Sequence, residues 1–317
     1  MRKCFAYTLA ACLLFTLSCN RGNTVTTNQP TIALVLKTLN NPFFIDMRKG
    51  AQETAQKLGV NLTVQAAERE VDVEKQMQII ENLIQTKVAA LCITPSGSKE
   101  VVPAIVKANK AGIPVIIVDT RVNPETLQAA NGKVSGFIGS DNLAGGRVAG
   151  ELIAQKLGGK GKVAILEGIP GHETGDSRLQ GFREVMAKHP GIQIVSSQTA
   201  NWERDQGFNV FQNMLQAHPD IDAVFAASDL MALGAVEAIA AAGKTGKIRV
   251  VGFDALDDAK QAIARGAMDA SVAQFPSEMG RVAVENAVKV IRGEKLPPNT
   301  LVKLEMVTKD SLLRKQE

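Results

Sequence analysis

The sequence has few of the side chains that build metal centres and hydrolytic active sites. Its 317 residues include three histidines, and none of them stands at metal-ligand spacing from another His or Cys. No G-x-S-x-G nucleophile motif is present and no G-x-G-x-x-G follows a strand. The GKT at 243–245 is not a P-loop, because Ala238 stands where that motif needs Gly. The sequence therefore predicts a protein that is not an enzyme and that uses no metal and no cofactor.

Cysteine is also scarce, with four residues in the chain. Cys4, Cys12 and Cys19 fall near the start, so that only Cys92, inside the apolar run AALCIT, belongs to the body of the chain. A single cysteine cannot build an internal disulfide framework. We expect Cys92 to be a small buried apolar residue.

Long hydrophobic runs are missing after residue 20, where no window offers the roughly 18–20 uncharged apolar residues that span a bilayer. The start of the chain differs, because Arg2 and Lys3 precede an uncharged stretch typical of a signal peptide. That stretch ends in FTLSC, which is similar to a bacterial lipobox with Thr16 in place of the usual Leu. We therefore expect a signal peptide over 1–18, a lipid on Cys19 and a polar tether over 19–30, with plain secretion as the alternative.

These expectations place the protein in the periplasm or on the cell surface of a bacterium, held to the membrane by its lipid alone. Neither sign of charge dominates, since the net charge of +4 falls to about +2 when Arg2 and Lys3 leave with the signal. Aromatic residues make up 4% of the chain, and no dense Lys/Arg cluster contains them. A nucleic-acid partner is therefore not expected.

From residue 31, short apolar runs alternate with segments of helical period. The predicted strands are 31–37, 61–65, 88–93, 113–119, 136–139, 162–168, 192–198, 222–227, 248–254, 268–274 and 301–307. The strands are rich in Val and Ile without polar alternation, as in parallel strands covered on both faces. Repeated strand–helix units favour doubly wound α/β sheets, and the strand count favours two sheets of about five strands over a TIM barrel.

Polar and aromatic residues follow several predicted strands at their carboxyl ends, where open α/β sheets bind ligands. They are Asn41, Phe43 and Phe44 after the first strand, Asp119, Thr120 and Arg121 after 113–118, Ser228 and Asp229 after 222–227, Asp254 after 248–253, and Gln274 after 268–273. Carboxylates, guanidinium groups and amides suit sugar hydroxyls, and aromatic faces suit the apolar side of the ring. Trp202 lies in a polar loop and is added to the site.

Several of these residues also have structural interpretations. Asp141 and Asp229 precede helical segments and are predicted helix N-caps. Ser228 is either a cap or a pocket residue, and Phe43 and Phe44 are either core or ligand-facing.

Residues 31–309 resemble the ribose- and allose-binding branch of type I periplasmic binding proteins. The matching stretches, in family order, are LKTLNNPFF, VDT, IGSDN, GHETGDSRLQGF, ANWERD, AASDLMALGA, VVGFDA and VAQFP. The resemblance implies two doubly wound lobes with parallel sheets, joined by a three-strand hinge and closing around a monosaccharide. It implies a monomer that delivers the sugar to ABC permease subunits.

The implied lobes are 31–140 plus 275–303 and 141–274 plus 304–317. The chain then crosses between them near Ser140-Asp141, Gln274-Phe275 and Lys303-Leu304.

The resemblance also assigns ligand-binding positions one by one. Those that match are Asn41, Phe43 and Phe44 in the first loop, Asp119, Arg178, Trp202, Asp254 and Gln274, together with Lys37 as in allose-like members. Two positions depart from the ribose pattern, because Thr120 stands where ribose relatives have Arg and Ser228 where they have Asn. If the segment stays extended, Arg121 points to the same side as Asp119 and substitutes for the missing Arg. The identity of the sugar is therefore left open.

Two other classes of protein share this architecture. The effector core of a lac-repressor-type regulator would begin with a DNA-reading helix-turn-helix, whereas this chain begins with an export signal. A binding protein for a polyol or an autoinducer-like ligand, feeding a chemoreceptor, stays open as an alternative.

Overall fold

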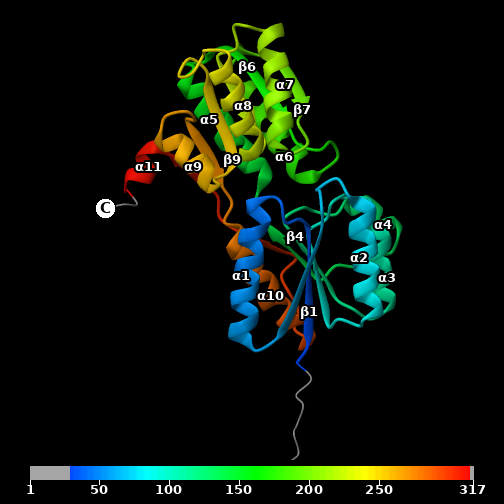
Figure 1. The fold of residues 1–317 in the computed structure, drawn as a ribbon. Coiled ribbons are helices and arrows are strands. Elements are labelled where there is room, and N and C mark those ends of the chain that lie inside the picture. Colours follow the sequence, from blue (N-terminus) through cyan, green and yellow to red (C-terminus); the bar gives the residue numbers. More distant parts are fainter. Residues whose placement is uncertain (1–28, 315–317) are drawn as a thin grey trace, which may run out of the picture.

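Two six-stranded sheets organise the chain, and each forms the centre of one lobe (Figure 1). The computed structural model describes residues 29–314. The predicted signal peptide and the lipidation of Cys19 lie outside the described residues. Between residues 29 and 314, no helix has both the length and the apolar composition needed to cross a bilayer.

The sheet of the N-lobe has the strand order β11-β5-β4-β3-β1-β2 and is parallel throughout. Its strands are β1 (Thr31–Thr38), β2 (Asn61–Ala67), β3 (Ala90–Ile93), β4 (Val115–Val118), β5 (Gly136–Gly139) and β11 (Asn299–Leu301). Its helices are α1 (Pro42–Leu58), α2 (Val73–Gln85), α3 (Val102–Lys110), α4 (Pro124–Ala129) and α10 (Pro276–Ile291). Figure 1 shows α1 and α10 on one side of this sheet and α2, α3 and α4 on the other.

The sheet of the C-lobe has the corresponding order β12-β10-β9-β8-β6-β7, and only β12 runs antiparallel to its neighbour. Its strands are β6 (Lys160–Glu167), β7 (Gly191–Thr199), β8 (Ala223–Ala226), β9 (Arg249–Asp254), β10 (Ala270–Ala273) and β12 (Glu305–Thr308). Its helices are α5 (Asn142–Lys156), α6 (Glu173–Met186), α7 (Arg204–Ala217), α8 (Asp229–Ala241), α9 (Asp257–Ala264) and α11 (Lys309–Arg314). The two sheets thus repeat one topology, with β1 to β5 matched by β6 to β10.

Burial explains why these segments form strands. The central strands β3, β4 and β8 are buried along their whole length, so their Val, Ile and Leu side chains face helices on both sides of the sheet. Removing that apolar surface from water is the main favourable term in folding each lobe. The predicted fold class is therefore confirmed.

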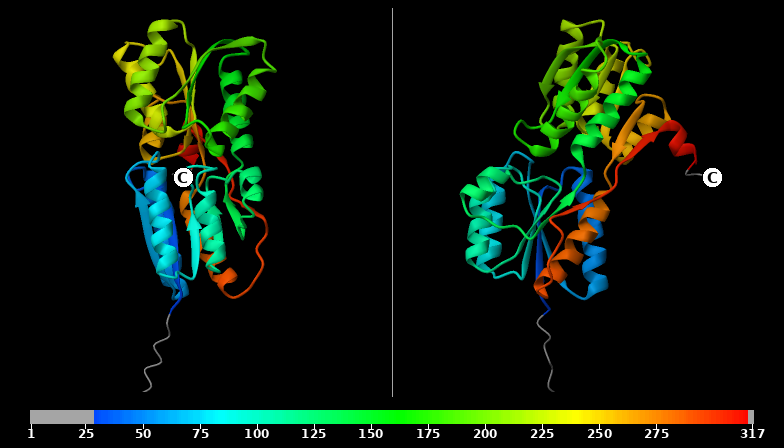
Figure 2. Two further views of the ribbon diagram at one scale, coloured as in Figure 1. Left: turned by 90° about the vertical axis from the view of Figure 1, so that its right-hand side faces the viewer. Right: turned by 180° about the vertical axis from the view of Figure 1, so that it is seen from behind.

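The chain passes between the two sheets at three places (Figure 2). It leaves the N-lobe after β5, returns to it after β10, and leaves it finally between β11 and β12. The last passage corrects the predicted strand at 301–307, which the structure divides between the two lobes. The apolar run LVKLEMV has strand-like composition throughout, so composition did not reveal the break.

In the C-lobe, helices α5 and α6 pack closely together at Arg178, one of the predicted ligand-binding residues. A Cβ atom on Gly146 of α5 would lie 2.0 Å from the backbone oxygen of Arg178 in α6, so only glycine permits this approach. The N-lobe packs α1 against α10 in the same way, with Gly280 facing the backbone of Met47.

Candidate functional site

A pocket with an empty volume of about 320 Å³ lies where the two lobes meet. It is lined by Lys37, Asn41, Phe43, Phe44, Glu70 and Asp119 from the N-lobe, by Thr174, Arg178, Trp202, Ser228 and Asp254 from the C-lobe, and by Gln274 at the second passage between the lobes. The structure therefore brings together all of the predicted ligand residues except Thr120 and Arg121. Within residues 29–314, no group of three or more His, Cys, Asp or Glu side chains is arranged to hold a metal ion.

Two carboxylates stand at matching positions of the two sheets. Asp119 follows β4 with φ at 65°, and Asp254 ends the corresponding strand β9 with φ at 113°. Positive φ is uncommon outside glycine and is concentrated at functional sites. Both strands thus end in the same unusual way, and each presents an acid to the pocket.

Arg178 is fixed in place by its neighbours in the C-lobe. Its Nε donates to Asn142 Oδ1 at 2.9 Å, and its Nη1 donates to the backbone oxygen of Ala227 at 2.7 Å. The guanidinium carbon lies 3.8 Å from the centroid of the Phe253 ring. Burial lowers the pKa of Arg178 and the nearby Asp254 opposes this, so the guanidinium stays a positive donor inside the pocket. Its Nη2 makes no hydrogen bond to the described residues.

Asp254 and Gln274 form the polar wall beside this arginine. Gln274 Nε2 donates to Asp254 Oδ1 at 2.6 Å, and Arg178 Nη1 lies 3.7 Å from the same oxygen. Burial raises the pKa of Asp254 to about 7, while Arg178 and Gln274 lower it. Gln274 Oε1 is buried without a hydrogen-bond partner among the described residues. A buried acceptor of this kind is costly unless a donor such as a ligand hydroxyl reaches it.

The N-lobe contributes a second cluster of charges. Lys37 Nζ lies 3.8 Å from Glu70 Oε2 and 3.8 Å from Asp119 Oδ2, and its side chain is only 3% exposed. Thr120 does not line the pocket, but its hydroxyl donates to Asp119 Oδ2 at 2.9 Å. The pocket is thus strongly polar on both sides.

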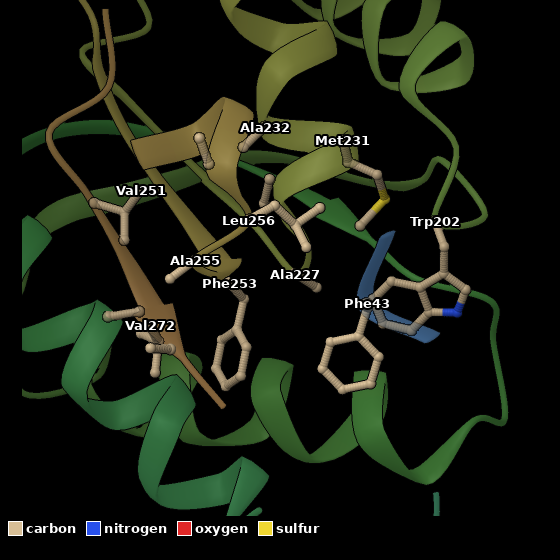
Figure 3. Packing of buried hydrophobic residues seen from close by; sticks show 14 of the residues in the cluster. Phe43, Trp202, Ala227, Met231, Ala232, Val251, Phe253, Ala255, Leu256 and Val272 are labelled. Carbon is tan, nitrogen blue, oxygen red and sulfur yellow. The ribbon is translucent and has the colours of Figure 1, made fainter. Parts of the chain in front are cut away.

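Aromatic rings from both lobes close the pocket. Phe43 and Phe44 pack edge to face, with ring centroids 5.2 Å apart. Asn41 positions them by capping α1, since its Oδ1 accepts from the backbone N–H of Phe43 at 3.0 Å. The Trp202 ring comes from the loop after β7, and Figure 3 shows it with Phe43 among the buried apolar residues. Its Nε1 donates to His172 Nδ1 at 3.4 Å.

The prediction for Arg121 is wrong. Because Asp119 adopts a positive φ, the segment does not stay extended, and Arg121 does not line the pocket. Its Nη1 donates to Asn299 Oδ1 at 2.8 Å, and its guanidinium lies over the Phe137 ring. Arg121 therefore secures β11 against β5 and does not replace the missing ribose-type arginine.

The predicted helix caps have mixed outcomes. Asp141 caps α5 as predicted, accepting from the backbone N–H of Ala144 at 2.9 Å. Ser228 both caps α8 and lines the pocket. Asp229 is not a cap, because its buried carboxylate instead accepts from Ser271 Oγ and from the backbone N–H of Leu256.

Two pocket residues, Glu70 and Thr174, were not predicted. Glu70 lies in the charged segment EREVD, whose composition is typical of an exposed loop. Thr174 is the second residue of α6, in the segment GHETGDSRLQGF from which the prediction took Arg178 alone. Only the position of Glu70 just after a strand signalled a site residue.

Contacts between the lobes accompany the pocket. Arg69 Nη2 in the N-lobe lies 2.8 Å from Glu203 Oε1 in the C-lobe, where both side chains are partly exposed. The backbone N–H of Glu173 also lies 3.4 Å from Ser98 Oγ of the opposite lobe. The structure is therefore a closed form, with the lobes in direct contact around the pocket.

A buried polar pocket between two like α/β lobes defines a two-lobed ligand-binding protein. Residues 32–295 match the family described as periplasmic binding protein domain, and the chain belongs to this family. The predicted family resemblance is thereby confirmed.

Solved and curated relatives cover nearly the whole chain. The ribose import binding protein RbsB of Escherichia coli (strain K12) is 42% identical over 279 residues, covering 88% of this chain and 90% of the relative. The D-allose-binding periplasmic protein of the same strain is 38% identical over 283 residues, covering 87% and 91%. A crystal structure of an ABC transporter periplasmic solute binding protein from Actinobacillus succinogenes 130z, with bound D-allose, superimposes with a TM-score of 0.86 at 42% identity. It covers 90% of this chain and 100% of that one. These relatives are sugar-binding transport proteins and not enzymes, in agreement with the predicted absence of catalysis.

Proposed function

We propose that the protein captures one monosaccharide of the ribose or allose type between its lobes and delivers it to the permease subunits of an ABC importer. The observation that carries this proposal is the unused hydrogen-bonding capacity of the buried pocket. Among the described residues, Arg178 Nη2 has no acceptor and Gln274 Oε1 has no donor, and both side chains line a pocket flanked by aromatic rings. A sugar supplies hydroxyls that donate and accept, and an apolar ring face that packs against aromatic side chains.

The division into lobes is part of the same proposal. We assign 31–140 plus 275–303 to one lobe and 141–274 plus 304–317 to the other, with hinge rotation at the three passages of the chain. The sheet membership of β5, β10, β11 and β12 supports these boundaries. Opening at this hinge would separate Arg69 from Glu203 and give the sugar access to the pocket.

The N-terminal segment completes the proposal. We assign 1–18 as a signal peptide and Cys19 as the acylated first residue of a monomeric protein in the periplasm or on the cell surface. The lipobox-like FTLSC supports this assignment. Expression of the full chain with labelled palmitate tests it: wild-type protein is expected in the membrane fraction with label, and Cys19→Ser without it. Label that persists in Cys19→Ser would exclude this site.

Calorimetric titration of the protein tests the sugar assignment. The panel is ribose, allose, psicose, fructose, xylose, galactose and inositol. We expect saturable one-to-one binding of at least one monosaccharide, and a rise in melting temperature, because ligand at 100 times its Kd stabilises the folded protein against unfolding by about 2.7 kcal/mol. Binding of inositol alone would favour the polyol alternative. Absence of any heat and any thermal shift across the panel would refute the sugar assignment.

A further inference from the structure

Glu70 is a largely buried acid that comes from the loop between β2 and α2. Its side chain is 11% exposed, although the neighbouring Glu68 and Arg69 are exposed. Asn41 Nδ2 donates to Glu70 Oε1 at 3.0 Å, which fixes one carboxylate oxygen and turns the other towards Lys37. A carboxylate loses much hydration on such burial, so its position needs a compensating partner.

Lys37 compensates the charge of Glu70 without bonding to it. Its ammonium carries three N–H donors, yet it lies 3.8 Å from both Glu70 Oε2 and Asp119 Oδ2. These distances exceed the roughly 2.7–3.2 Å of a hydrogen bond. A ligand hydroxyl next to both groups can accept from the ammonium and donate to the carboxylate. The spacing therefore fits a hydroxyl held by two partners.

The three pocket carboxylates share one pattern. Asp254 Oδ1 accepts from the Gln274 amide, Glu70 Oε1 accepts from the Asn41 amide, and Asp119 Oδ2 accepts from the hydroxyl of the next residue. No donor in the described part of the chain hydrogen-bonds the second oxygen of any of the three. One oxygen of each acid is thus held by the protein, and the other is available to a ligand.

The electrostatics of Glu70 agree with this geometry. Burial is the largest influence on its pKa and raises it, while Lys37 and the Asn41 hydrogen bond lower it, so that the pKa stays above its ordinary value. The carboxylate therefore lacks part of the donation that would offset its burial. A hydroxyl donating to Oε2 supplies a further hydrogen bond to the charged form.

We propose that Glu70 binds the ligand directly and that Glu70 and Lys37 together hold one particular sugar hydroxyl. This assignment rests on the proposed sugar-binding function. The hydroxyl accepts from the Lys37 ammonium and donates to Glu70 Oε2. The pocket therefore selects against sugars that lack a hydroxyl at that position, because such a sugar leaves the Lys37 ammonium and Glu70 Oε2 without a hydrogen-bond partner.

The test is a calorimetric cycle between protein variants and deoxy sugars. The sugar that binds wild-type protein most tightly, and each of its monodeoxy analogues, are titrated into wild type, Glu70→Gln and the control Glu68→Gln. We expect Glu70→Gln to weaken the parent sugar by about 10–100-fold, because its amide NH₂ would face the Lys37 ammonium. One deoxy analogue should bind poorly to wild type and no worse to Glu70→Gln, which identifies the contacted hydroxyl. The exposed Glu68→Gln should match wild type throughout.

Each outcome bears on a separate claim. If wild type binds a sugar and Glu70→Gln weakens all analogues by the same factor as the parent, Glu70 acts only by positioning its neighbours and the proposal is wrong. If no sugar binds wild type, the proposed function itself fails. A crystal structure of the wild-type complex tests the contact without any substitution: a ligand oxygen within about 3.2 Å of Glu70 Oε2 supports the proposal, and a gap beyond 4 Å overturns it.

Discussion

The two lobes share one strand order but present different chemistry to the pocket. After the first strand, Asn41 caps α1 in the N-lobe, and His172 occupies the same cap position on α6 in the C-lobe. After the second strand, the N-lobe offers Glu70 and the C-lobe Trp202. Only the matched strands β4 and β9 end alike, in acids at positive φ. A repeated scaffold thus fixes where side chains stand, while the sequence of each lobe decides which chemistry stands there.

The largest effects on sugar binding and stability are expected when the cation of each lobe, Arg178 or Lys37, is removed. Arg178→Met should abolish sugar binding and lower the free energy of unfolding by about 3–5 kcal/mol, because Asp254 loses its counter-charge and the buried acceptors of Arg178 lose their donor. Lys37→Met should weaken binding with a smaller loss of stability, because the Lys37 ammonium makes no hydrogen bond to the described residues. Calorimetry and denaturant unfolding measure the two effects. Equal losses of stability in Arg178→Met and Lys37→Met would contradict the expected difference between the two lobes.

The matched acids provide a sharper test. Asp119→Asn and Asp254→Asn should each weaken sugar binding by about 10–100-fold, because each removes a charged acceptor for ligand hydroxyls. Both variants keep a side chain that tolerates positive φ, although Asp254→Asn also leaves the buried Arg178 without this counter-charge and should lower the melting temperature. The corresponding Ala variants should melt at lower temperature, since Ala has no such tolerance. An Ala variant as stable as its Asn counterpart would show that positive φ is not retained there.

The cap positions differ in their response to pH. Burial lowers the pKa of His172 from 6.5 to about 3, with Lys37 acting in the same direction. The closed form therefore holds neutral His172. Opening removes the N-lobe, with its Lys37 charge, from His172 and so raises the pKa towards its ordinary value, which means that protonation favours the open form. Relative to His172→Gln, wild-type sugar affinity should fall by up to about tenfold between pH 8 and pH 5.5.

The raised pKa of Asp254 has the opposite effect on the pH dependence of binding, because closure then takes up a proton at this carboxylate. Asp254 is present in both wild type and His172→Gln, so the ratio of their sugar affinities reports on His172 alone. Asn41, the N-lobe cap, does not titrate. A ratio that stays constant from pH 8 to pH 5.5 would show that closure does not exclude protons from His172.

The smallest effect on sugar binding is expected from the partly exposed contact between the lobes. Arg69→Gln removes the ion pair with Glu203 and should weaken sugar binding only a few-fold, because partly exposed pairs are screened by water and salt. The difference from wild type should vanish in 1 M NaCl. A large loss that survives high salt would indicate that Arg69 also contacts the ligand.

Sequence reasoning predicted most of the fold because the strands are continuous apolar runs separated by segments of helical period. It failed where the physical signal is not local. The run 301–307 has strand composition throughout, but its two ends pair with different sheets. Arg121 was misplaced because extended geometry was assumed next to Asp119, whose positive φ depends on tertiary packing. Glu70 was missed because burial in the closed form cannot be inferred from a charged loop.

Trp202 is the one tryptophan in the sequence, and it is 5% exposed. Its ring packs so closely on Gly168 that a Cβ atom there would lie 1.9 Å from Cζ2, and its N–H meets His172. Both neighbours belong to the same lobe, so the ring stays with them when the lobes separate, and only the surface turned to the pocket gains water. The protein therefore carries its own optical probe. Its emission should move to longer wavelength on opening and return on closure, so that occupancy can be followed in real time without a label.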